Sequence, residues 1–143
     1  MTTINEVMTA THRVCDRYFA AAEEAVAEED WPAAEAAWGQ FSLLLEKHMT
    51  VLEEGLLFPA FEEFNGQAGP TQVMRTEHEQ IHALAGQLRV ALSARDKQAF
   101  LGIAETLMLL IQQHNMKEEQ ILYPMMDESI ANAAELVGKL QQE

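Results

Sequence analysis

The histidines of this 143-residue chain carry the clearest chemical signal. Each of the five lies on the apolar stripe of a predicted helix, or one helical turn from another histidine that does. They are His12, His48, His78, His82 and His114. Side chains four residues apart on an α-helix project about 40° apart, so His78 and His82 can reach one ion, and so can His114 and Glu118. A single inward histidine is usually structural, but a core holding five would leave unpaired polar groups that cost roughly 1–3 kcal/mol each. Imidazole and carboxylate donors together suit iron, so the pattern predicts a buried metal site.

The spacing between His48 and Glu53 is one residue longer than that between His114 and Glu118. On a regular helix five residues separate two side chains by about 140°, which is too far to share an ion comfortably. One inserted residue is commonly absorbed as a π-bulge, and Gly55 just beyond would ease the distortion. We therefore expect a widened turn between His48 and Glu53. An unbroken helical ladder there would leave Glu54, or no residue, as the ligand.

The chain also repeats itself. The segment from Glu53 to Pro59 matches the segment from Glu118 to Pro124, and at an offset one residue longer His12 falls on His78 and His48 on His114. The match predicts two similar halves related by a pseudo-twofold axis, each offering His, His and Glu.

Apolar residues recur at spacings of three and four almost throughout, without alternating β-type segments, so we predict an all-α fold. Capping and breaking residues give the expected helix boundaries. The first helix begins at Thr3 with Glu6 in capping-box spacing, and the second begins after Asp30, at Trp31-Pro32. The loop 65–70 precedes the third helix, which ends near 93–95, and Asp96 caps the fourth. Ile121 is expected on the buried stripe of the fourth helix, and a short helix is expected at about 128–141. Four long helices with short connections favour an up-down-up-down four-helix bundle.

Composition limits the function classes. A formal net charge of -14 with nine Lys and Arg argues against nucleic acid or anionic membranes as partners and suits a cation. One cysteine rules out an internal disulfide, and neither a signal peptide nor a membrane-length apolar stretch is evident. We therefore expect a single cytoplasmic domain spanning 1–143, and assembly into homo-oligomers is compatible with the sequence.

These motifs together resemble the hemerythrin-like, or HHE cation-binding, family over about residues 5–125. The motifs are His12, His48 with Glu53-Glu54 and Leu57-Phe58-Pro59, His78-x-x-x-His82, and His114-x-x-x-Glu118-Glu119 with Leu122-Tyr123-Pro124. The resemblance implies a four-helix bundle with two iron ions in an oxo- or hydroxo-bridged centre. Carried over by position, the five histidines match terminal ligands and Glu53 and Glu118 match bridging carboxylates. The chain departs from the usual His-x-x-x-Glu at His48.

The resemblance also implies a function. With all five histidines bound, one coordination position would stay open, which favours a protein that reversibly binds O2 or NO as carrier, scavenger or sensor. Without His82 each iron would keep one open position, as suits iron-sulfur cluster repair, iron storage or delivery, or peroxide reduction. We favour binding over enzymatic activity, and a metal-free helical interaction module is the third hypothesis.

Three further residues have competing interpretations. Asp16 stands four residues after His12 and is expected to be a solvated acid, although it could orient or weakly bind the metal. Cys15 is expected to act as a small apolar residue. Tyr123 could hydrogen-bond a bridging group, but its repeat partner is Phe58, so packing is the expectation.

Overall fold

The computed structural model describes residues 2–66 and 69–142, and within these ranges every regular element is helical, which confirms the all-α class. In chain order the elements are α1 (Ile4–Ala27), α2 (Trp31–Glu46), the π-helix η1 (Lys47–Leu57), α3 (Phe58–Asn65), α4 (Gly69–Ser93), α5 (Lys97–Lys117), the π-helix η2 (Glu118–Leu122), α6 (Tyr123–Ser129) and α7 (Ala133–Gln142). None of the helices in these ranges has the length and apolar character needed to cross a membrane.

The predicted helix starts are confirmed by their caps. The Thr3 side chain accepts a hydrogen bond from the Glu6 amide at 3.1 Å. Asp30 and Asp96 cap α2 and α5 in the same way. Gly66 ends α3 with a left-handed φ of 73°, inside the predicted loop, whose residues 67–68 lie outside the described ranges.

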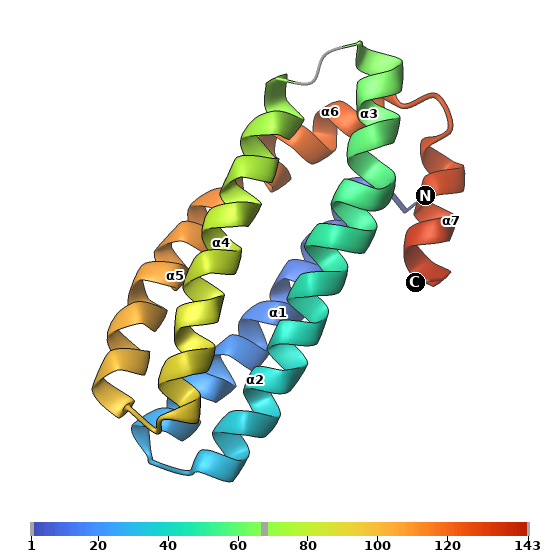
Figure 1. The fold of residues 1–143 in the computed structure, drawn as a ribbon. Helices are drawn as coiled ribbons and strands as arrows, with labels where there is room; N and C mark the ends of the chain where they lie inside the picture. Colours follow the sequence, from blue (N-terminus) through green and yellow to red (C-terminus); the bar gives the residue numbers. More distant parts are fainter. Residues whose placement is uncertain (1, 67–68, 143) are drawn as a thin grey trace.

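The helices pack along a common long axis (Figure 1). Helix α1, the rod formed by α2, η1 and α3, helix α4, and the rod formed by α5, η2 and α6 lie side by side. Helix α1 contacts α2 and α5, and α4 contacts α5. The molecule is thus a helical bundle, while the up-down-up-down order and the pseudo-twofold repeat stay predictions.

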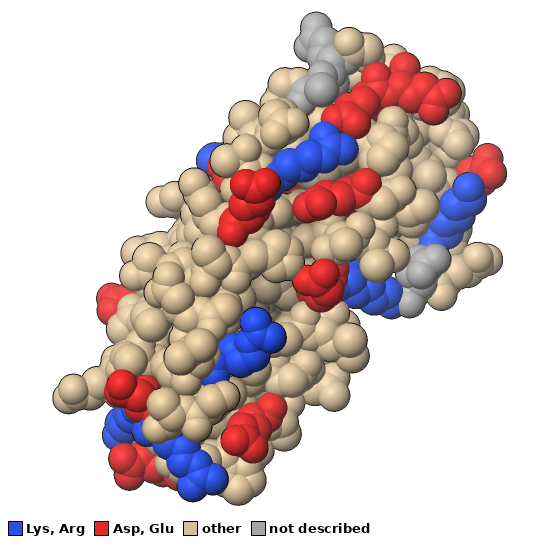
Figure 2. Space-filling view, in the orientation of Figure 1, with Lys and Arg blue, Asp and Glu red and all other residues tan. Residues whose placement is uncertain are grey.

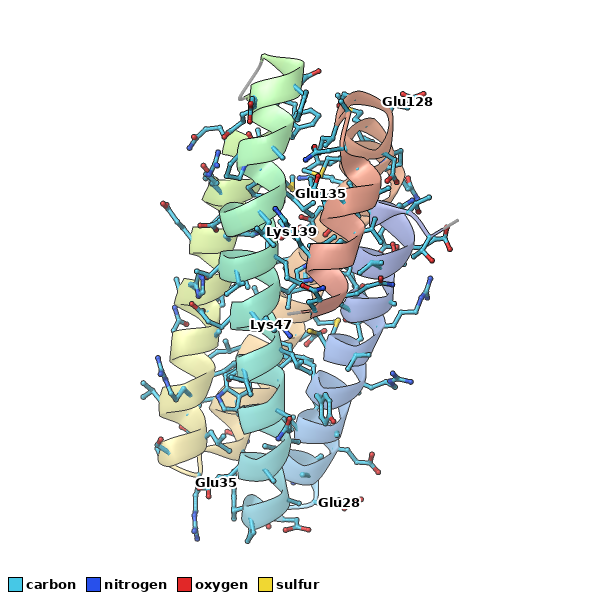
Figure 3. The ribbon with its side chains drawn as sticks, turned by 90° about the vertical axis from the view of Figure 1, so that its right-hand side faces the viewer. Glu28, Glu35, Lys47, Glu128, Glu135 and Lys139 are labelled. Atoms are coloured by element: carbon cyan, nitrogen blue, oxygen red, sulfur yellow. The ribbon has the colours of Figure 1, made fainter. Side chains whose placement is uncertain are left out.

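The C-terminal helix α7 lies against the outside of this bundle. It contacts α1 and η1, and its buried residues are Leu136, Val137 and Leu140. Figure 3 shows α7 beside these elements, with Lys47 near its C-terminal end. The helix begins later than expected because Ile130 takes an extended conformation after α6.

The core consists of two hydrophobic clusters with a polar layer between them. One cluster gathers around Phe19, Phe41 and Phe100, and the other around Phe58 and Phe61. The buried polar and charged residues outside these clusters are His12, His48, Glu53, Thr71, His78, His114 and Glu118. All of these except Thr71 form the candidate site described next.

The two π-helices change which residues face the core. The widened turn predicted between His48 and Glu53 is confirmed, because η1 spans both residues. The second π-helix, η2, was not expected. It turns Ile121 outward, where 59% of its surface is exposed, and buries Leu122 instead, so the prediction for Ile121 was wrong.

Candidate metal centre

Six buried side chains converge from all parts of the bundle. They are His12 of α1, His48 and Glu53 of η1, His78 of α4, His114 of α5 and Glu118 of η2. Their donor atoms form two groups, one of Glu53, His78, His114 and Glu118 and the other of His12, His48 and Glu118. Within each group all donor atoms lie within 4.8 Å of one another. We call the first the α4–α5 position and the second the α1–η1 position.

The two carboxylates lie between these positions. Glu53 turns Oε1 toward His78 Nε2, at 2.9 Å, and Oε2 toward His48 Nε2, at 3.6 Å. Glu118 places Oε1 3.1 Å from His12 Nε2 and 3.4 Å from His114 Nε2. Each carboxylate therefore faces a histidine of both positions, which is the arrangement needed to bridge two ions.

Each imidazole has its other nitrogen, Nδ1, in a hydrogen bond on its outer side. His12 Nδ1 lies 2.7 Å from Glu119 Oε2, and His114 Nδ1 lies 2.8 Å from Glu77 Oε1. A carboxylate only accepts, so Nδ1 carries a proton and Nε2 is the nitrogen that can offer a lone pair to a metal ion in the centre.

The other two imidazoles follow the same pattern. His78 Nδ1 lies 2.5 Å from Glu54 Oε2, and His48 Nδ1 lies 2.7 Å from the Thr11 hydroxyl. Sequence reasoning missed these four outer partners. Only Glu54 and Glu119 left a signal, as the second members of the two repeated Glu-Glu pairs.

The donor set fits metal ions. Among the described residues, Oε1 of Glu53, Oε2 of Glu118, and Nε2 of both His78 and His114 are buried without a hydrogen-bond partner. Lone pairs that face one another at about 3 Å repel unless a proton or a cation lies between them. Nitrogen and carboxylate donors of this kind suit iron, so the side chains present fit the group that the sequence predicts.

Charge in the centre is set by burial and by close neighbours. Burial raises the pKa of Glu53 well above its ordinary value, and the charge of Glu118 adds to the effect. Burial acts on Glu118 in the same direction, but the charge of His114 and a hydrogen bond from Glu53 outweigh it and hold the pKa of Glu118 well below its ordinary value. Burial also lowers the pKa of His48 to about 4. Burial thus favours the protonated form of Glu53 and the neutral form of His48.

Tyr123 belongs to the centre, contrary to the expectation that it only packs. Its hydroxyl lies 2.5 Å from Glu53 Oε2 and 2.9 Å from Glu118 Oε1, and it can donate to either. It also lies 3.2 Å from Nε2 of both His12 and His48. Burial raises the pKa of Tyr123 well above its ordinary value, and the charges of Glu118 and Glu53 add to this, so the phenol keeps its proton.

The structure does not bring His82 to the centre, which corrects the expected pairing with His78. Its side chain is 44% exposed, and its Nδ1 lies 3.7 Å from Glu46 Oε2 on the surface. One helical turn carries His82 about 6 Å along α4, away from the level of His78 and beside Glu46 of α2. Asp16 also lies outside both donor groups, and burial raises the pKa of Cys15 to about 11, which keeps it a neutral thiol.

Comparison with known proteins agrees with this geometry. Residues 3–126 match the family model of the hemerythrin HHE cation binding domain, and this range contains every residue of the two donor groups. The searches of curated proteins and of solved structures found no match. Because the match covers most of the chain and includes the whole centre, the protein belongs to the hemerythrin HHE cation-binding domain family.

Proposed function

We propose that this chain is a non-haem di-iron protein whose centre takes O2, NO or peroxide. One iron would occupy the α4–α5 position and the other the α1–η1 position, with Glu53 and Glu118 as bridging carboxylates. The convergence of four imidazole Nε2 atoms with these two carboxylates carries the proposal. Bound iron would supply redox chemistry and open coordination positions for a small ligand.

The finer description of the fold belongs to the same proposal. We propose a single domain spanning 1–143, built as an up-down-up-down bundle with a pseudo-twofold repeat. In such a bundle the first half of the chain would supply the histidines of the α1–η1 position, and the second half those of the α4–α5 position. In support, each half of the chain contributes two histidines and one glutamate to the donor groups.

The space beside the centre favours a small ligand. A void of about 20 Å³ lies against His12, His48 and His114, and its other walls include Phe41 and Ile111. A void of this size holds about one water molecule, so a diatomic or peroxide fits and a larger substrate does not.

Two observations favour a redox or iron-handling role over reversible carriage of O2 or NO. His82 is remote from the centre, so four histidines are available and each iron keeps an open position. Tyr123 places a hydroxyl donor within hydrogen-bonding distance of both carboxylates, where it would stabilise negative charge that develops in a reduction step. Reversible binding by a carrier, scavenger or sensor is the second candidate, and the small void supports it equally.

The surface supports the choice of small-molecule partners. Figure 2 shows acidic and basic side chains interspersed over one face, with no continuous basic field. With a net charge of -14, the chain is not proposed to bind nucleic acid or anionic membranes. A cytoplasmic location and assembly into homo-oligomers remain part of the proposal.

Anaerobic reconstitution with ferrous iron, followed by air, tests the function. We expect two irons per chain and a lasting oxidised form, measured by metal analysis and visible absorption. An oxygenated form that reverses under vacuum would instead support the carrier, and a chain that retains no iron would refute both.

A matched pair of histidine variants tests the residues. His78→Ala removes a donor of the α4–α5 position and should lose about one iron of the two, because a buried ligand is missing. His82→Ala, on the same helix, should keep both, since His82 is exposed. Equal losses from the two variants would contradict this assignment.

A further inference from the structure

We infer that the two metal positions are unequal in affinity, and that Thr11 makes the α1–η1 position the weaker one. The inference rests on the proposed function, because it concerns how the same centre takes up its two ions. It assigns to Thr11 a positioning role through His48.

The outer hydrogen bonds of the imidazoles differ in kind. His12, His78 and His114 each donate to a carboxylate, whereas His48 donates to the Thr11 hydroxyl. The single hydroxyl proton of Thr11 is itself donated to the Met8 carbonyl at 2.7 Å. Thr11 therefore accepts from His48 as a neutral group.

A neutral acceptor makes the imidazole a weaker ligand. Hydrogen bonds to an ionised acceptor are about twice as strong as neutral ones, and they raise the basicity of the opposite ring nitrogen. The α4–α5 position has carboxylates behind both of its histidines. The α1–η1 position has one carboxylate and one hydroxyl, so it attracts a cation less strongly.

The position of Glu53 works in the same direction. Its Oε1 lies 2.9 Å from His78 Nε2 in the α4–α5 position, whereas its Oε2 lies 3.6 Å from His48 Nε2 in the α1–η1 position. A closer anionic donor strengthens the attraction for a divalent cation in a buried site.

The surroundings give the weaker position a route to solvent. A surface cavity of about 590 Å³ between α1, η1 and α7 reaches Thr11 and His48, and its apolar wall includes Val14 and Leu52. Metal can thus enter and leave on the Thr11 side. The α1–η1 position should fill second and empty first.

Titration of the metal-free protein with Co²⁺, followed by calorimetry and visible absorption, tests the inference. The wild type should take up two equivalents, the first at least about tenfold more tightly than the second. Thr11→Val keeps the shape of the side chain but removes the acceptor, so it should weaken the second equivalent by about 10–100-fold and leave the first unchanged. Thr11→Ser, which keeps the hydroxyl, should restore the second equivalent.

Two further variants serve as controls. Thr9→Val makes the same change two residues away, where the hydroxyl donates to Asn5, and it should alter neither equivalent. Glu54→Gln removes the carboxylate behind His78 and should weaken the first equivalent instead of the second. Circular dichroism of each variant checks that the fold is retained.

The possible outcomes separate the inference from the proposed function. Two equivalents of equal affinity would overturn the inequality, and a Thr11→Val variant that weakens both equivalents or neither would overturn the role of Thr11. Either result would leave the di-metal centre intact. A wild-type chain that takes up fewer than two ions would overturn the proposed centre itself, and the inference with it.

Discussion

The outer hydrogen bonds of the imidazoles also hold the bundle together. Each one joins a histidine to a side chain of another helical element: His12 of α1 to Glu119 of η2, and His114 of α5 to Glu77 of α4. A change in any of these contacts therefore alters both the orientation of a ligand and the contact between two helices.

Tyr123 offers a test of the hydrogen bonding inside the centre. Tyr123→Phe removes a buried hydroxyl that donates to Glu53 or to Glu118. We expect the free energy of unfolding of the metal-free protein to fall by about 1–3 kcal/mol, measured by urea denaturation. Tyr18→Phe is the control, because Tyr18 is 36% exposed and its loss should cost less than about 0.5 kcal/mol. Equal effects of the two substitutions would show that the Tyr123 hydroxyl contributes only packing.

Helical spacing was enough to predict which way His12, His48, His78 and His114 face, because each lies on an apolar stripe. Helical spacing could not exclude His82, because a residue four positions from an inward histidine can lie on the same face of the helix. Thr11 and Glu77 could not be found either. Each reaches an imidazole on another part of the bundle, and only tertiary packing sets that contact.

At the scale of elements, the two π-helices share a cause that the sequence contains. The Phe58 amide bonds to the Glu53 carbonyl and the Tyr123 amide to the Glu118 carbonyl, each five residues back. Proline follows directly in both repeats, and its ring clashes with the carbonyl four residues before it in a regular α-helix. A wider turn relieves that clash. The extra residue between His48 and Glu53 was the signal that predicted η1. The second π-helix, η2, which turns Tyr123 inward, could have been predicted from Pro124.

Gly55 tests the packing inside η1. A methyl group added there would lie 3.2 Å from the Thr50 carbonyl oxygen, a backbone atom that cannot easily move. Gly102 of α5 is the control, because a methyl group added there meets no described atom within 4 Å. Gly102→Ala should stabilise the protein by about 0.5–1 kcal/mol through helix propensity, and Gly55→Ala should gain nothing or destabilise it. Urea denaturation of both variants measures the difference, and an equal gain at Gly55 would show that η1 tolerates the extra atom.

At the scale of the whole molecule, the polar layer divides the hydrophobic core in two. Its ligands come from every rod of the bundle, so a metal ion bound there links segments far apart in the chain. An ion that binds the folded chain and not the unfolded one stabilises the fold by mass action, by about 4 kcal/mol at a free concentration a thousandfold above its dissociation constant. Metal binding and folding should therefore be strongly coupled in this protein.

The pH dependence of that coupling follows from the protons that the metal displaces. Burial, with the charge of Glu118 adding to it, raises the pKa of Glu53. Burial lowers the pKa of His114, but the charge of Glu118 outweighs it, so the net shift is upward. Groups with a raised pKa stabilise the metal-free fold below their unfolded pKa and lose that contribution as pH rises through the folded pKa. Burial lowers the pKa of His48 to about 4, so His48 is already neutral in the fold above about pH 5 and the metal displaces no proton from it. Its cost to the fold is lost as pH rises through its unfolded pKa, equally with and without metal.

The difference in melting temperature between the Co²⁺-loaded and metal-free protein should therefore widen from about pH 5 to about pH 8. Each displaced proton raises the apparent metal affinity by about tenfold per pH unit. Thermal denaturation of both forms across this range measures the gap. Glu23→Gln is the control, because burial also raises the pKa of Glu23 but this residue belongs to neither donor group. In this variant the melting-temperature difference should widen with pH as it does in the wild type. A gap that stays constant or narrows with pH would mean that Glu53 and His114 already lack their protons before the metal binds.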